Sequence, residues 1–305
     1  MKSPSDAAIA AAAELLDAHP DFRVIRRLAI HDSFDASIPG PLAIAVVIDT
    51  ETTGTRHGED RIIEVGIVRF EYQAETGRVA KVVGVYSGLE DPGIPIPPES
   101  TAIHGITDEM VAGQRLDESA IAAVVDGASL VIAHNASFDR PFLEERMPLF
   151  RALPWACSLE QVPWADEGFR GAKLEYLGWS SGFFYDAHRS EVDCRALLEV
   201  LSRPLPKSGV TGLRRLVESA AEPALRLWAT GSPFETKDIL RERGYRWDAD
   251  RRCWSRVVAR AVAKEESEWL KAAVYGGRPA QIDVEVLDAR IRFSGRPGPR
   301  KPRVL

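Results

Sequence analysis

The sequence predicts an α/β protein, in which a mixed sheet flanked by helices is followed by a small α+β module. Three observations predict this class. The apolar run Leu42–Ile48 has the length of a strand that is buried on both faces. Two strand-like segments, 61–72 and 79–89, are joined by a turn containing Gly77, as in a hairpin. Helical segments follow, with one short apolar strand, 130–133, among them.

The chain divides into five parts by composition. The Ala-rich part, 1–40, is expected to be a lead that is helical from about Asp6 to His19. It lacks the basic region and the Leu-rich stretch of a signal peptide. The other expected parts are a main domain at 41–202, a Pro- and Gly-containing linker at 203–211, the module at 212–295 and a basic, Pro-rich tail, expected to be disordered, at 296–305.

Charge is distributed unevenly between these parts. Residues 1–200 hold 17 basic and 32 acidic side chains, whereas residues 201–305 hold 22 and 13, for a total net charge of −6. Such asymmetry indicates two units with different roles. The three cysteines are too widely spaced for a disulfide framework or a zinc site, and no apolar run approaches the roughly 20 residues of a membrane span. We therefore expect no membrane partner and a cytoplasmic location.

A pair of acids ends the first buried strand. Asp49 and Glu51 are two residues apart, so in an extended strand they point to the same face. Neighbouring carboxylates repel each other unless a cation lies between them, and hard divalent ions prefer oxygen ligands. The alternative is a polar exit from the strand into a turn that contains Gly54.

Two more acidic motifs stand at predicted strand ends and helix starts. His134–Asp139 reads His-Asn-Ala-Ser-Phe-Asp and follows the second buried strand, and His188–Asp193 opens the last helix of the main domain. Each has a simpler explanation when taken alone. Asp139 could be an acid at a helix N-terminus, and Ser190 with Asp193 resembles a capping box.

In combination, the three motifs resemble those of the DEDDh (DnaQ-like) 3′→5′ exonucleases over about residues 42–201. The four acids of that name match Asp49, Glu51, Asp139 and Asp193, and the histidine matches His188. Ser190 departs from the usual alanine of the family. The resemblance implies a ribonuclease-H-like sheet and an enzyme that hydrolyses phosphodiester bonds, of the type found in proofreading and DNA repair.

The resemblance also implies roles for these residues. The four acids would bind two Mg²⁺ or Mn²⁺ ions, with Asp49 between them, and two such ions stabilise both the attacking and the leaving oxygen. His188 would be the general base, because an unperturbed histidine titrates near neutrality. Residues expected to contact the terminal nucleotide are Thr50, Thr52, Thr53, Gly54, His104, Asn135 and Phe138. For Phe138 a core position is the alternative.

The module interleaves aromatic and basic residues, as nucleic-acid-binding surfaces do. The arginines expected to make such contacts are Arg243, Arg246, Arg251 and Arg252, whereas Trp247 and Trp254 are expected in the core. The alternative is a module whose arginines are only solvated.

The expected function is release of nucleoside 5′-monophosphates from the free 3′ end of a single-stranded nucleic acid, with DNA favoured. An RNA-directed exoribonuclease is one alternative, since no residue announces recognition of the 2′-hydroxyl. A factor that binds within a DNA polymerase or repair assembly is another.

Overall fold

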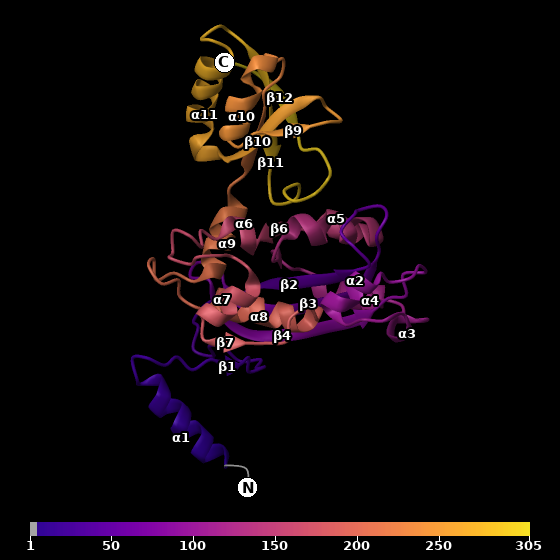
Figure 1. Cartoon of the computed structure of the whole chain (residues 1–305), viewed down its shortest axis with the longest axis vertical. Coiled ribbons are helices and arrows are strands. Elements are labelled where there is room, and N and C mark those ends of the chain that lie inside the picture. The colour runs from indigo at the N-terminus through magenta and orange to yellow at the C-terminus, as the bar shows by residue number, and fades with distance from the viewer. Residues whose placement is uncertain (1–4) are drawn as a thin grey trace.

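The computed structural model describes residues 5–305, and Figure 1 shows two sheet-and-helix units with a helix projecting from one end. That helix, α1 (Asp6–Asp17), forms where a helix was predicted and has no buried residue. Residues 1–4 of the predicted lead lie outside the described part. The lead is tied to the main domain by β1 (Arg26–Arg27), which pairs in parallel with β7 (Phe183–Phe184).

The main domain is built on a five-stranded sheet in the order β4-β3-β2-β5-β6. Its strands are β2 (Ala43–Thr52), β3 (Ile62–Gln73), β4 (Arg78–Leu89), β5 (Val131–Ala133) and β6 (Trp155–Cys157). The first three are antiparallel, whereas β5 is parallel to β2 and β6 to β5. This confirms the predicted mixed, ribonuclease-H-like sheet. Strand β6 was not predicted from the sequence.

The central strand β2 is buried on both faces, as its continuous apolar run predicted. Ala45 and Val47 belong to one core cluster, and Val46 and Ile48 belong to the other. The first cluster lies under α7 (Leu174–Ser180) and α8 (Ser190–Ser202), and the second lies under α4 (Glu118–Val125) and α5 (Ala136–Arg146). The shorter helices of the domain are α2 (Pro98–His104), α3 (Asp108–Val111), η1 (Pro148–Arg151) and α6 (Ser158–Gln161).

The segment expected to be a linker is instead part of the main domain. Leu205 is buried in the first core cluster, and Pro204 and Thr211 form an isolated bridge. The following helix, α9 (Gly212–Ala221), adds Leu213 and Leu216 to the same cluster. The boundary between the two cores therefore falls near residue 222 and not at 203–211, because the apolar face of α9 packs backwards.

The C-terminal module contains a second five-stranded sheet in the order β12-β11-β8-β10-β9. Its strands are β8 (Ala224–Trp228), β9 (Arg246–Asp248), β10 (Cys253–Ala259), β11 (Gln281–Leu287) and β12 (Arg300–Val304). One face packs on helices that contribute Leu240, Ala263 and Leu270 to a separate core. These helices are η2 (Phe234–Thr236), α10 (Lys237–Glu242), η3 (Arg260–Val262), α11 (Ala263–Trp269) and η4 (Leu270–Val274).

The basic tail is also ordered, contrary to expectation. Residues 300–304 form β12, which pairs antiparallel with β11 at the edge of the module's sheet. Pro302 lies opposite Asp283 in this pairing. Proline is tolerated there because an edge strand has one side without hydrogen-bond partners.

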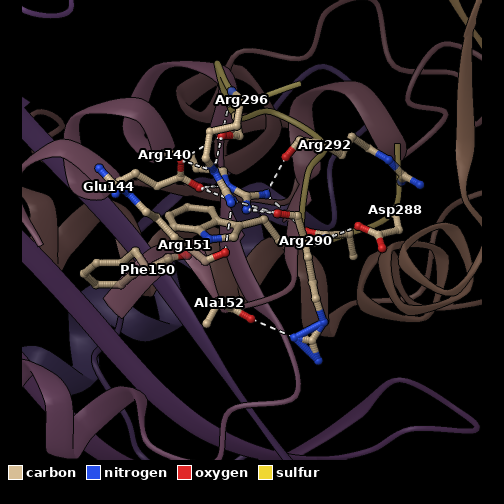
Figure 2. A network of polar contacts seen from close by, with 12 residues as sticks. Arg140, Glu144, Phe150, Arg151, Ala152, Asp288, Arg290, Arg292 and Arg296 are labelled. Atoms are coloured by element: carbon tan, nitrogen blue, oxygen red, sulfur yellow. Dashed lines mark hydrogen bonds and ion pairs between the residues drawn. The ribbon is translucent and has the colours of Figure 1, made fainter. Parts of the chain in front are cut away.

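A segment of the module returns to the main domain. Residues 288–296, called the docking segment below, connect β11 towards β12 and contact α5, η1 and β6. Figure 2 shows the contacts of this segment with Arg140, Glu144, Arg151 and Ala152. The two units are therefore joined by more than the chain between α9 and β8. Within residues 5–305, no helix is long and apolar enough to cross a membrane.

Candidate active site

The acids of the first motif lie where β2 ends. Asp49 and Glu51 occupy the last residues of this central strand, between β3 on one side and β5 on the other. Asp193, in the first turn of α8, joins them, and the three residues offer carboxylate oxygens that lie within 4.8 Å of one another. The structure thus brings Asp193 together with a pair of acids that precede it by 142 and 144 residues along the chain.

Gly66 allows α8 to approach the sheet. A Cβ atom at this position on β3 would lie 2.4 Å from the backbone nitrogen of Glu191, which is closer than non-bonded atoms come. The start of α8 therefore rests directly on β3. Asp193 accepts hydrogen bonds from the Arg189 backbone N–H (3.0 Å) and from the Tyr185 hydroxyl (3.2 Å). These two donors fix the carboxylate on the side of the sheet that carries Asp49.

Asp139 reaches the same place from α5. Its Oδ1 atom accepts hydrogen bonds from the backbone N–H of Thr50 (3.0 Å) and from the Thr50 hydroxyl (2.8 Å), and only 2% of the residue is exposed. Thr50 stands between Asp49 and Glu51, so this double contact holds Asp139 against the acidic pair. The left-handed backbone of Asn135 (φ 89°) turns the chain from β5 into α5.

The carboxyl groups of this cluster are buried and lie close to one another, and both conditions raise their pKa values. Burial, followed by the charges of Asp139, Asp193 and Glu51, holds the pKa of Asp49 well above its usual range. Burial and then the charge of Asp193 raise the pKa of Glu51 to about 8. Burial raises the pKa of Asp139 to about 7. Bringing a divalent cation between these oxygens relieves both the desolvation and the repulsion, so the donor set fits a hard metal ion.

The same shifts predict how the metal-free protein responds to pH. The pKa of Glu51 is about 8 in the folded chain and near 4.5 when unfolded, so this group lowers stability progressively as pH rises from about 4.5 to about 8. In excess EDTA, Glu51→Gln is expected to raise the free energy of unfolding at pH 8 by about 1–3 kcal/mol, and by far less at pH 5. Chemical denaturation at both pH values measures this. The exposed Glu75→Gln is the control, and equal effects of the two substitutions would contradict the prediction.

Sequence reasoning missed a fifth acid, Glu64. It lies on β3 directly opposite Glu51 and is 1% exposed. Its carboxylate accepts hydrogen bonds from the Arg189 side chain (2.8 and 3.1 Å), the Ser190 backbone N–H (2.9 Å) and the Ser190 hydroxyl (3.2 Å). Ser190, the departure from the family pattern, is therefore engaged by Glu64. The available signal was a single Glu inside the apolar segment 62–65.

Glu64 thus anchors the residues that follow His188. His188 is exposed, and its left-handed backbone (φ 66°) is costly for a non-glycine residue, so it needs support from its neighbours. The bonds to Arg189 and Ser190 supply that support. The structure places His188 on the loop entering α8, five residues before Asp193.

Loss of the Glu64 carboxylate is expected to slow the phosphodiester hydrolysis that the sequence motifs predict, without weakening substrate binding. Glu64→Gln removes the ion pair with Arg189 and is expected to lower kcat by about 10- to 100-fold, as loss of supporting groups around metal sites does. KM for an oligonucleotide is expected to change by less than about twofold. Steady-state kinetics test this. The control is Glu71→Gln, which removes a half-buried glutamate of the same strand that pairs with Lys81, and a kcat equal to that of the control would refute the role of Glu64.

The residues expected to contact the terminal nucleotide lie around the acids, but several are already engaged. The hydroxyls of Thr50, Thr52 and Thr53 bind Asp139, the Gly54 carbonyl (2.5 Å) and Asp60 (3.3 Å), respectively. A Cβ atom on Gly54 would lie 2.6 Å from the Asp60 carboxylate, so a larger residue here would displace that side chain.

His104, Asn135 and Phe138 differ in exposure. His104 ends α2 and is 5% exposed; its Nδ1 accepts from the Ile106 backbone N–H (3.0 Å), and its buried Nε2 has no partner among the described residues. Asn135 is exposed beside the site. Phe138 is half-buried and packs on Phe142. His104 therefore has a buried ring nitrogen that no described residue uses.

The four arginines of the module that were expected to contact nucleic acid do not form one group. Arg243 binds Glu266 (3.1 Å) on the helical side and stacks over Trp269, so it is used within the module. Arg246, Arg251 and Arg252 are exposed on or beside the hairpin of β9 and β10. The Arg251 guanidinium lies 4.6 Å from the centre of the Trp228 ring on the other face of the sheet.

Two arginines that sequence reasoning missed join Arg251 there. Arg226 and Arg300 also stack on the Trp228 ring, at 5.6 and 4.7 Å. The register of β8 and β11 places Glu285 beside them. Trp247 is 51% exposed and contacts Trp254 edge to face, so the first of these tryptophans is not in the core as expected.

Comparison with known proteins adds a family match and several relatives. The RNase_T family model, described as "Exonuclease", matches residues 46–201. DNA polymerase III subunit epsilon of Treponema pallidum is 33% identical over 164 residues, which cover 50% of this chain and 73% of that protein. Exodeoxyribonuclease 10 of Escherichia coli is 29% identical over 211 residues, which cover 66% and 88%.

Other relatives are much longer than the matched segment. A DNA polymerase III subunit epsilon-like protein of Rhodobacter capsulatus is 38% identical over 149 residues, which cover 43% of this chain and 20% of that protein. Among solved structures, exonuclease X in complex with 5′ overhanging duplex DNA is 29% identical, with a TM-score of 0.41, and the match covers 56% of this chain and 97% of that one.

Proposed function

Because the chain belongs to the exonuclease family whose model matches residues 46–201, we propose that it removes nucleotides one at a time from the 3′ end of single-stranded DNA. Nuclease activity belongs to the family. The direction, the strand and the products, nucleoside 5′-monophosphates, are our proposal. The observation that carries it is the meeting of Asp49, Glu51 and Asp193, with Asp139 held beside them through Thr50.

Metal dependence follows from the family and from this donor set, and we propose two Mg²⁺ or Mn²⁺ ions. Asp49 would be shared between them, Glu51 and Asp193 would complete one site, and Asp139 would support the other. When bound, such ions offset the charge that develops on the phosphate and on the attacking and leaving oxygens.

The chain's own residues would handle the proton and the geometry. His188 takes the proton from the water that attacks phosphorus, and the bond from phosphorus to the 3′ oxygen breaks. The terminal nucleoside 5′-monophosphate leaves, and the 3′ oxygen of the shortened strand takes up a proton from water to become a hydroxyl. Glu64 keeps the His188 loop in place through Arg189 and Ser190. The unpartnered Nε2 of His104 is available to a terminal nucleotide, with Asn135, Phe138 and the Thr52–Gly54 turn around it.

We propose that the exposed arginines of the module, Arg246, Arg251 and Arg252, contact the strand upstream of its 3′ end. A polymerase or repair assembly remains a proposed partner, because several relatives are polymerase III subunits or resemble them. A cytoplasmic location is supported by the three free cysteines, Cys157, Cys194 and Cys253.

A comparison of matched DNA and RNA strands tests the proposed substrate. With 5′-labelled oligonucleotides of one sequence and excess Mg²⁺, we expect a ladder that shortens from the 3′ end. We expect kcat/KM to be at least about tenfold higher on DNA, a difference of about 1.4 kcal/mol. A preference for RNA would favour the exoribonuclease alternative. Binding without any hydrolysis would favour the polymerase-associated factor.

A further inference from the structure

Arg140 is the residue after Asp139 on α5, and it has no exposed surface. Its guanidinium donates from Nε to Glu144 (2.7 Å) one turn along the helix. Its other nitrogens donate to backbone carbonyls of the docking segment: Nη1 to Ala289 (3.1 Å) and Arg292 (2.5 Å), and Nη2 to Arg290. Figure 2 shows this guanidinium enclosed by the segment. A buried charge is tolerated only with such partners.

The docking segment forms a second set of hydrogen bonds with the same helix, at Glu144. Glu144, 5% exposed, also accepts from the Ser294 hydroxyl (2.7 Å) and from Arg296 (both nitrogens at 3.0 Å). Two arginines thus surround one carboxylate, and the excess positive charge faces the three carbonyl oxygens that bind Arg140. Arg140 and Glu144 therefore need the docking segment, because α5 alone does not supply all of their hydrogen-bond partners.

The segment is also fixed to the rest of the main domain. The Ala289 carbonyl accepts from the Trp155 backbone N–H at the outer strand β6 (2.7 Å), and Arg290 donates to the Ala152 carbonyl (2.7 Å). Arg292 donates to the carbonyls of Ser219 (3.0 Å) and Glu222 at the end of α9. The segment is therefore a rigid support for α5.

Helix α5 is consequently held from two sides. Successive residues of an α-helix point about 100° apart, so Asp139 faces the acidic cluster while Arg140 faces the docking segment. On the first side the contact is Asp139 with Thr50, and on the second it is Arg140 with the three carbonyls. A rotation of α5 that breaks the bonds of Arg140 therefore also displaces the Asp139 carboxylate. Likewise, a rotation that breaks the bonds of Asp139 displaces the Arg140 guanidinium.

We propose that Arg140 is a positioning residue, through which the docking segment sets the orientation of α5 and thereby places the Asp139 carboxylate for metal binding. Through this contact the module influences the metal site, although the docking segment is far from Asp139 in the sequence. The proposal rests on the proposed function in one respect, since it takes Asp139 to be a metal ligand.

The test uses the full chain and compares Arg140→Lys with Arg256→Gln. Lysine keeps the charge beside Glu144, but its three donors sit on one nitrogen, so it cannot bind Glu144 and all three carbonyls together. Arg256 pairs with Glu266 inside the module and does not touch α5, so Arg256→Gln controls for the loss of an arginine–glutamate pair. Each protein is measured for the Mg²⁺ concentration giving half-maximal rate, for KM of the strand, and for the Mg²⁺-induced rise in unfolding temperature.

Arg140→Lys is expected to raise the half-saturating Mg²⁺ concentration by about 10- to 100-fold, as loss of supporting contacts to metal ligands does. It is expected to reduce the Mg²⁺-induced thermal shift and to leave KM within about twofold. Arg256→Gln is expected to leave all three at the wild-type values. If Arg140→Lys lowers the unfolding temperature in EDTA but its Mg²⁺ response matches that of the control, the inference is overturned.

Ser294→Ala provides a milder variant in case Arg140→Lys does not fold. It removes one hydrogen bond to Glu144 from the segment's side, and it is expected to shift the Mg²⁺ response in the same direction by a smaller factor. An unchanged response would count against the inference. The thermal shift needs no hydrolysis, so a wild-type chain that binds Mg²⁺ without cutting a strand would refute the proposed function while the positioning role is still measured.

Discussion

Asp49→Ala is expected to lose Mg²⁺-dependent degradation of a 5′-labelled single strand by at least about 10³-fold, because Asp49, as the proposed shared metal ligand, would supply several kcal/mol of transition-state stabilisation. Asp49 faces Asp139, Asp193 and Glu51, so its removal also relieves repulsion among the remaining acids. The variant should therefore fold at least as well as the wild type in EDTA. Rates and unfolding temperatures measured together separate loss of chemistry from loss of structure.

Two controls accompany the Asp49 experiment. Asp49→Asn keeps the shape of the side chain and is expected to be nearly as inactive, because the missing element is charge. Asp32→Ala removes an exposed acid that pairs with Arg195, and it is expected to retain full activity. Undiminished hydrolysis by Asp49→Ala, or by the wild type in excess EDTA, would eliminate the metal mechanism.

A chain truncated after residue 202 is expected to be unfolded, whereas one truncated after residue 222 is expected to fold with reduced stability. The shorter chain loses Leu205, Leu213 and Leu216 from the main core, at about 1.5–3 kcal/mol each. Both lose the docking segment, and with it three hydrogen bonds to Arg140 at about 0.5–1.5 kcal/mol each, because water then reaches the guanidinium. Together these losses approach the 5–15 kcal/mol that typically stabilises a domain.

Circular dichroism and thermal unfolding of the two truncated chains give the comparison. The expected order of unfolding temperature is full length, then 1–222, with no cooperative transition for 1–202. A chain of residues 1–202 that unfolds at the same temperature as 1–222 would show that α9 contributes nothing to the main core.

Much of the site was predictable because its residues follow local rules. Asp49 ends a run of apolar residues, and Asp139 and Asp193 fall in the first turns of helices, where acids are favoured. Their order along the chain matched one family. Glu64 offered only a weak signal, since its partners, Arg189 and Ser190, lie more than 120 residues away. A lone charge in a strand does not reveal what it binds.

The module was predicted less completely, because its contacts depend on distant segments. The Pro- and Lys-containing stretch 203–211 has the composition of a linker, yet Leu205 is buried beneath α9. The basic tail has the composition of a disordered segment, yet it forms an edge strand on β11. Arg140 looked like an ordinary helix residue, since nothing near it in sequence indicates the carbonyls of residues 289–292.

The bonds between Arg140 and the docking segment have a consequence for synthesis on the ribosome. Arg140 and Arg290 are 150 residues apart, so at 5–20 residues per second the carbonyls that accept hydrogen bonds from Arg140 emerge about 8–30 s after it. Over that interval Arg140 has only Glu144 and water as partners. A nascent chain can therefore build the strands bearing Asp49 and Glu64 early, but it completes the seating of α5 only when translation is almost finished.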